Sequence, residues 1–176
     1  MVITRTDAAA LEAALAAVPD PEVPVVTIAD LGILRAVEVD ETTGEAHVVI
    51  TPTYSGCPAM EAIRAHVEHV CRRQGWMPTV STRLDPPWTT DWISEDGRDK
   101  LRRFGIAPPS GRGAVAADAS SRHTGVVALE LRVHVVACPQ CGSTDTTELA
   151  HFGSTACKAL RRCNSCREPF DEFKAI

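Results

Sequence analysis

Four of the seven cysteines occur as two Cys-x-x-Cys pairs, and this spacing is the strongest indication of metal chemistry in the chain. The first pair is Cys138 and Cys141, and the second is Cys163 and Cys166. Each pair can supply two thiolates to a tetrahedral site, which is the usual arrangement around a structural zinc ion. We therefore predict that these four cysteines bind zinc. An iron or iron–sulfur centre on the same ligands is the alternative.

A fifth cysteine, Cys57, lies between a predicted strand at residues 45–51 and a predicted helix at residues 58–74. Pro58 is typical of the first helical position, and Gly75 is typical of the position just past a helix. The unpaired amides and the dipole of a helix N-terminus favour an anion, so we expect the pKa of the Cys57 thiol to lie below its ordinary value. Such a thiolate could bind a soft metal or attack an electrophile. The simpler interpretation is a small buried residue in a tight turn.

The elements around Cys57 predict an α+β fold. Apolar residues recur at helical spacing in some segments and alternate in others, with turn residues between them. The expected order is helix, strand, strand, helix, strand, helix, at residues 7–18, 33–40, 45–51, 58–74, 76–84 and 94–103. A strand, a helix and a strand in succession favour a crossover connection, so the strands would form a small mixed sheet with covering helices. We assign this domain to residues 1–107.

The chain changes character after residue 107. Residues 108–125 are rich in Gly, Ser, Ala and Pro, which is typical of a flexible linker. Residues 126–176 hold an expected strand at 126–137, both cysteine pairs and alternating residues between the pairs, so they predict a zinc ribbon. A module of this size rarely folds on an apolar core alone. Zinc binding, worth about 10–16 kcal/mol in comparable sites, would stabilise it.

Composition argues against several classes of function. The formal net charge is −5, and the ribbon has as many acidic as basic residues, so nucleic acid is not an expected partner. No apolar run approaches the roughly 20 residues of a membrane span, and the N-terminal residues lack a secretory signal. Cysteine pairs of the metal-binding kind suit a reducing compartment. We therefore expect a cytoplasmic protein.

Three stretches carry a resemblance that covers nearly the whole chain. Residues 20–33 and 51–59 resemble the family of small iron–sulfur assembly proteins that includes SufT. Residues 152–160, together with both cysteine pairs, narrow the resemblance to the D-subunit family of the ring 1,2-phenylacetyl-CoA epoxidase system.

The resemblance implies a non-catalytic accessory subunit of a monooxygenase (epoxidase) complex in phenylacetate degradation, acting in the maturation or assembly of its metal centres. Iron or an iron–sulfur cluster is then the expected transient cargo. Other epoxidase subunits or iron–sulfur assembly factors are the expected partners, and a homodimer is left open. The resemblance places a site at Cys57, Asp20, Glu22, Thr53, Tyr54 and Ser55. On composition alone, the loop with Asp20 and Glu22 would be a solvated turn.

Two other functions remain open from the sequence. Cys57 could be a nucleophile for acyl transfer or thioester hydrolysis, with His47 or His66 as its base. The zinc ribbon could alternatively bind nucleic acid. Cys157 lies outside the two pairs and is either a spare thiol or a ligand of a centre other than zinc.

Overall fold

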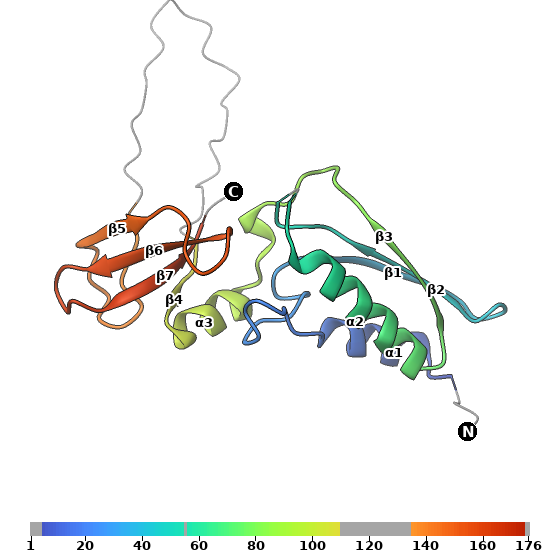
Figure 1. The fold of residues 1–176 in the computed structure, drawn as a ribbon. Coiled ribbons are helices and arrows are strands. Elements are labelled where there is room, and N and C mark those ends of the chain that lie inside the picture. The colour runs from blue at the N-terminus through green and yellow to red at the C-terminus, as the bar shows by residue number, and fades with distance from the viewer. Residues whose placement is uncertain (1–4, 55, 110–134, 175–176) are drawn as a thin grey trace, which may run out of the picture.

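The computed structural model describes residues 5–54, 56–109 and 135–174. In the first part of the chain, two helices cover one face of a three-stranded sheet (Figure 1). The helices and strands are α1 (Ala8–Ala16), β1 (Leu34–Asp40), β2 (Glu45–Ile50), α2 (Ala59–Arg73) and β3 (Met77–Thr82). β2 pairs antiparallel with β1 and parallel with β3. This mixed sheet and its covering helices confirm the predicted α+β fold.

Alternating apolar residues attach the sheet to the helices. Ala46, Val48 and Ile50 of β2 are fully buried, whereas Glu45 and His47 are exposed. The helices contribute to the same core the residues Leu11, Leu15, Ile63, Val67 and Cys71. Side chains two residues apart along the strand, and three or four apart along each helix, thus face the same core. The alternation and the helical spacing read from the sequence therefore describe the two sides of one core.

Helix α3 (Glu95–Phe104) leads from the first sheet to the second, and its ends carry the signals seen in the sequence. The Ser94 hydroxyl accepts a hydrogen bond from the Gly97 N–H, and Gly105 adopts a left-handed φ of 89° just past the last turn. Acidic residues occupy the first turn and basic residues the last, as the helix dipole favours. A short 3-10 helix, η1 (Thr90–Trp92), precedes α3, and β4 (Ile106–Ala107) follows it.

The second sheet has the strand order β4-β7-β6-β5. β5 (Thr146–Ala150), β6 (Lys158–Cys163) and β7 (Pro169–Phe173) pair antiparallel, as expected for a ribbon. β4 joins them by pairing parallel with β7, although it belongs to a part of the chain well before the cysteine pairs. A strand of two residues has no periodicity to detect, so this pairing was not anticipated.

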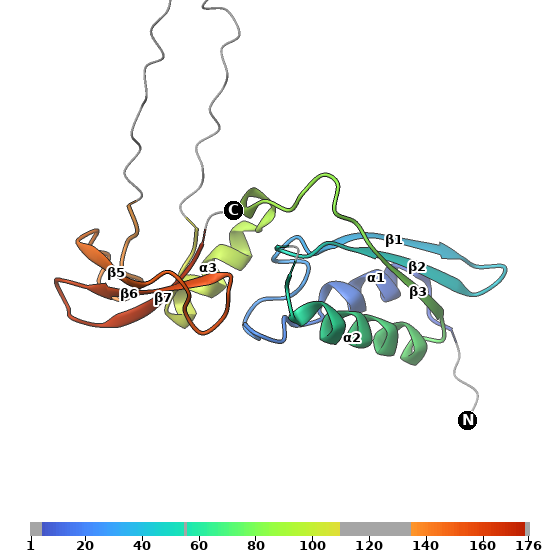
Figure 2. The same cartoon turned by 45° about the horizontal axis from the view of Figure 1, so that its top comes forward.

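A continuous hydrophobic core joins the ribbon to the first domain. The rings of Trp88 and Phe173 lie 6.2 Å apart between centroids, and the Trp88 indole N–H donates to the Leu31 carbonyl at 2.8 Å. Leu101 of α3 and Ile106 of β4 belong to the same buried cluster. Figure 2 shows α3 between the two sheets. The ribbon therefore packs directly on the first domain.

Several predicted segments fall wholly or partly outside the described residues. The expected linker at 108–125 is described only at residues 108 and 109, and the expected strand at 126–137 only at residues 135–137, which are not in a strand. Ser55 also lies outside them. Within the described ranges, every helix is too short or too polar to cross a membrane.

Candidate functional site

Cys57 lies in the turn that connects β2 to α2. The Cys57 N–H closes the turn by donating to the Tyr54 carbonyl at 3.1 Å. Pro58 occupies the cap position and α2 begins at Ala59, one residue later than predicted. The Cys57 side chain is half-buried and packs against the core without being enclosed by it. The residue is therefore not fully removed from solvent.

Burial has the largest effect on the pKa of the Cys57 thiol. Removal from water raises the pKa of the thiol above its ordinary value, and the nearby charges of Glu22 and Cys157 raise it further. Hydrogen bonds from the Ala59 N–H and the Thr53 hydroxyl act in the opposite direction but do not outweigh burial. The predicted lowering of the Cys57 pKa is therefore wrong. At neutral pH the group rests as a thiol, and it must lose its proton to bind a metal.

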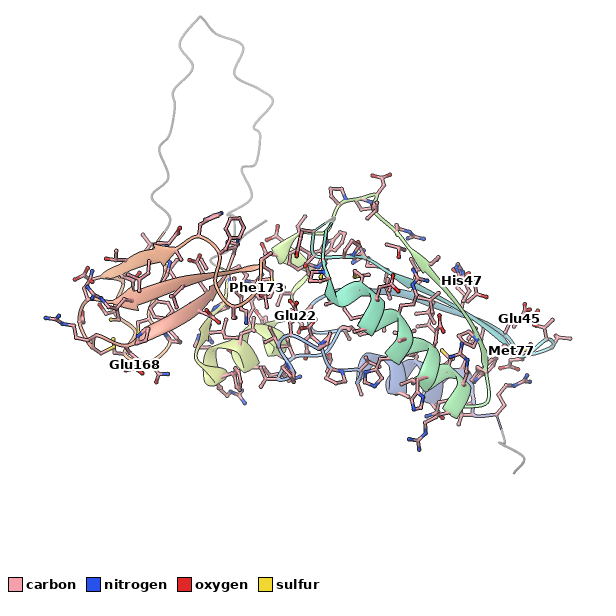
Figure 3. The ribbon with its side chains drawn as sticks, in the orientation of Figure 1. Glu22, Glu45, His47, Met77, Glu168 and Phe173 are labelled. Atoms are coloured by element: carbon pink, nitrogen blue, oxygen red, sulfur yellow. The ribbon has the colours of Figure 1, made fainter. Side chains whose placement is uncertain are left out.

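Asp20 and Glu22 lie in the loop between α1 and β1. The Asp20 carboxylate accepts hydrogen bonds from the N–H groups of Glu22 and Val23 at 2.9 and 2.7 Å, and burial raises its pKa. Asp20 is 5% exposed, so it shapes the loop from within, and the interpretation as a solvated turn is wrong for it. Glu22 is half-buried where the two sheets approach (Figure 3). Its charge acts on both Cys57 and Tyr54.

Thr53 and Tyr54 lie in the same turn as Cys57 and interact with it. Thr53 is buried, and its hydroxyl favours the thiolate of Cys57. The pKa of the half-buried Tyr54 is raised, first by loss of water and then by the charges of Cys57 and Glu22. The phenol therefore stays protonated and can donate a hydrogen bond at neutral pH.

Cys157 is a residue of this region that sequence reasoning left unassigned. It directly precedes β6, it is 7% exposed, and its sulfur lies 3.1 Å from the Thr155 hydroxyl. Burial has the largest effect and raises the pKa of the thiol above its ordinary value. The charge of Glu22 also raises the pKa, whereas the Thr155 hydroxyl lowers it. The only sequence signal was its position outside the two pairs. Cys57 and Cys157 come from different parts of the chain, and the charge of Glu22 acts on both thiols.

The four paired cysteines converge at the far end of the ribbon. The sulfurs of Cys138 and Cys166 lie 3.8 Å apart, those of Cys141 and Cys163 lie 3.5 Å apart, and all four lie within 4.8 Å of one another. Bonds of about 2.3 Å to a tetrahedral zinc ion place sulfur ligands roughly 3.8 Å apart, so the donor set fits structural zinc. Within the described ranges, no other group of three or more Cys, His, Asp or Glu side chains has ligand spacing.

The histidines considered as a base for Cys57 lie elsewhere. His47 is exposed on β2, where its ring pairs with the Ser81 hydroxyl at 2.8 Å. His66 is exposed on α2. The described groups that act on the Cys57 thiol are amide, hydroxyl, carboxylate and thiol groups, without an imidazole. The geometry therefore does not assemble the Cys–His pair that acyl transfer would need.

Both parts of the chain match known protein families. Residues 8–81 match the model of the iron-sulfur cluster assembly protein family, and residues 123–174 match the PaaD zinc beta ribbon domain. The fold and the cysteines thus define an iron–sulfur assembly domain joined to a zinc ribbon.

A curated relative narrows this class. The chain is 47% identical over 169 residues to an Escherichia coli (strain K12) protein provisionally named as the D subunit of 1,2-phenylacetyl-CoA epoxidase, and the match covers 93% of this chain and 90% of that protein. The chain therefore belongs to the family of the 1,2-phenylacetyl-CoA epoxidase D subunits, also called PaaD.

Solved structures show a weaker likeness. A domain of unknown function from Bacillus anthracis is 31% identical, with a TM-score of 0.49 over 53% of this chain and 89% of that one. A Mycobacterium tuberculosis protein associated with Fe–S complex assembly and repair is 29% identical, with a TM-score of 0.34 over 60% of this chain and 94% of that one.

Proposed function

We propose that this protein is an accessory subunit of 1,2-phenylacetyl-CoA epoxidase that helps to mature its iron or iron–sulfur centres. The observation that carries the proposal is the half-buried Cys57, whose thiol is acted on by the charge of Glu22, within a domain of the iron–sulfur assembly family. The name of the Escherichia coli relative supports the choice of epoxidase as the client.

The local chemistry suits a site that accepts a metal and then releases it. Iron or an iron–sulfur cluster would be bound as cargo by the thiolate of Cys57, because thiolate is the usual ligand of such centres. The thiol is protonated at rest, so binding of the cargo and loss of the proton are coupled. Re-protonation would favour release to a client. The Ala59 N–H stabilises the thiolate while the cargo is bound.

The other site residues support Cys57 in distinct ways. Asp20 fixes the loop through two backbone hydrogen bonds, and Glu22 would supply a carboxylate oxygen as a further ligand of the cargo. Thr53 and Tyr54 supply hydroxyl groups to the turn. Ser55 is proposed as part of the same site on the resemblance of its motif alone.

Zinc on the four paired cysteines has a separate, structural role in this proposal. The two Cys-x-x-Cys pairs would hold β5 and β6 to the segment at Cys138, and a module of this size rarely folds on an apolar core alone. We propose that this ribbon docks onto other epoxidase subunits or iron–sulfur assembly factors. A cytoplasmic location follows from the proposed partners.

The test is anaerobic purification of the full chain, followed by analysis of zinc, iron and sulfide. Wild type, Cys57→Ser, Cys141→Ser and the core variant Cys71→Ala are compared. We expect iron to be lost with Cys57→Ser alone, and zinc to be lost with Cys141→Ser. Cys71 is a matched control because it is a fully buried thiol of the same domain. Iron retained in full by Cys57→Ser would overturn the proposal.

A further inference from the structure

Phe152 lies in the turn between β5 and β6, and it is 67% exposed. No large apolar residue in the described ranges is more exposed. A single exposed apolar side chain is ordinary in a folded protein and does not by itself indicate a site. The surroundings of Phe152 do indicate one, because they hold the ring in place without covering it.

Two side chains fix the Phe152 ring. The Lys174 ammonium lies over the ring, 4.4 Å from its centroid, which is within the range of a cation–π interaction. The His151 ring meets Phe152 edge to face, with 5.1 Å between the centroids and 79° between the planes. The Lys174 ammonium also donates to the His151 carbonyl at 3.1 Å, so the two supports are linked. An exposed ring that is already ordered loses little side-chain entropy when a partner buries it.

The backbone that follows the ring is also tied to the ribbon. The Gly153 N–H donates to the Lys158 carbonyl at 2.8 Å, and the Ser154 hydroxyl donates to the Asp171 carboxylate at 3.1 Å. These bonds connect the turn to β6 and to β7 directly after Phe152. A fixed, exposed aromatic side chain is the kind of residue that anchors protein interfaces.

The charges beside the ring define the surface that it fits. Within the described ranges, the Lys174 ammonium has no ion-pair partner. The nearby Glu148 carboxylate is already engaged, because it pairs with His151 at 3.3 Å and with Arg161 at 3.7 Å. A positive charge is therefore left beside the Phe152 ring. The complementary surface presents a carboxylate next to an apolar pocket.

We propose that Phe152 is the anchor by which the ribbon docks onto a partner protein. Its ring enters an apolar pocket of the partner, and a carboxylate at the rim of that pocket pairs with Lys174. The proposal rests on the proposed function and deepens it, because it assigns docking on an epoxidase subunit to one side chain and states the chemistry of the surface that receives it.

Other occupants fit the surroundings of Phe152 less well. β5 is the edge strand of the second sheet (Figure 1), but its pairing with β6 is irregular between Glu148 and Ala150, and a bulge at an edge hinders the addition of another strand. A second copy of the chain would have to offer an acidic pocket, and the described linings of the cavity beside Arg102 and of the cavity beside Trp88 both lack an acidic residue. The formal net charge of −5 disfavours an anionic membrane.

The test is isothermal titration calorimetry of the zinc-loaded full chain with each purified epoxidase subunit. We expect wild type to bind at least one subunit, and Phe152→Ala to weaken that binding by at least about thirtyfold, as the loss of an interface anchor typically does. Phe104→Ala is the matched control and should bind as wild type does, because Phe104 is 60% exposed but ends α3. Lys174→Gln should weaken binding and reduce its dependence on salt concentration.

The outcomes separate this inference from the function on which it rests. Phe152→Ala removes an exposed ring, so the variant should keep the circular dichroism, zinc and iron of wild type. Equal affinities of Phe152→Ala and wild type would overturn the anchor, whereas loss of iron in Cys57→Ser would still support the proposed function. An unchanged salt dependence in Lys174→Gln would overturn the proposed carboxylate of the partner. Binding of wild type to no subunit would overturn both the anchor and the choice of the epoxidase as client.

Sedimentation experiments test the other two occupants. Wild type and Phe152→Ala are compared by analytical ultracentrifugation alone, and by cosedimentation with vesicles of phosphatidylglycerol and phosphatidylethanolamine. We expect the two proteins to behave alike in both experiments. Self-association or vesicle binding that Phe152→Ala abolishes would assign the ring to a second copy or to a membrane, and would overturn the proposal.

Discussion

Phe173→Ala tests whether the ribbon and the first domain form one cooperative unit. Phe173 is 1% exposed at the end of β7, and its ring packs on Trp88 at 6.2 Å. Removing a buried phenylalanine ring typically costs about 3–5 kcal/mol, because contacts are lost and a cavity remains. The pairing of the two rings accounts for roughly 0.5–1.5 kcal/mol of that. We therefore expect the free energy of unfolding to fall by about 3–5 kcal/mol.

The assay is urea unfolding of the zinc-loaded protein, monitored both by circular dichroism and by tryptophan fluorescence. A single wild-type transition with coincident probes would show that the ribbon and the first domain unfold together. Phe152→Ala is the matched control, because Phe152 is also in the ribbon but 67% exposed, and its loss should change stability by no more than about 0.5 kcal/mol. A cost below about 1 kcal/mol for Phe173→Ala, or two separate wild-type transitions, would refute the reasoning.

Single side chains near the Cys57 turn and in the loop between α1 and β1 give further predictions. Glu22→Gln removes a charge that opposes the thiolate, so the pKa of Cys57 should fall and its alkylation at neutral pH should speed up, as measured by peptide mass spectrometry; an unchanged rate would mean that Glu22 does not act on the thiol. Thr51→Val replaces a buried hydroxyl that has no hydrogen-bond partner among the described residues, so the free energy of unfolding should stay constant or rise by up to about 1 kcal/mol, and a clear loss would reveal a partner. Burial raises the pKa of Asp30, but hydrogen bonds, chiefly from Lys100 at 2.8 Å, lower it on balance below its ordinary 3.8. The stability that Asp30 contributes is therefore full above that pH and is lost as pH falls through the lower folded-state value. Acid unfolding of Asp30→Asn should show a shallower pH dependence, and a slope equal to that of wild type would contradict this.

Local signals in the sequence were enough to predict the elements of the first domain. Ser94 and Gly105 mark the two ends of α3, and alternation along β2 marks its buried face. The spacing of the two Cys-x-x-Cys pairs likewise predicted four converging sulfurs. These features depend on neighbours within a few residues or on a motif whose geometry is stereotyped, so they can be read without knowledge of the fold.

The features that were missed depend on contacts between distant segments. The pairing of β4 with β7 and the packing of Phe173 on Trp88 have no local signature. They bury Cys157 against the core of the first domain, which the sequence does not indicate. The sign of the Cys57 pKa shift failed for the same reason, because the helix N-terminus is visible in the sequence while the depth of burial is a property of the packed structure.

The most direct test of the central claim is the transfer of iron to metal-free epoxidase subunits. The zinc-loaded full chain is charged anaerobically with ferrous iron and mixed with those subunits, and their iron content and epoxidation activity are measured. Wild type and Cys71→Ala should restore iron and activity, whereas Cys57→Ser should not. Equal transfer by Cys57→Ser and wild type would contradict it.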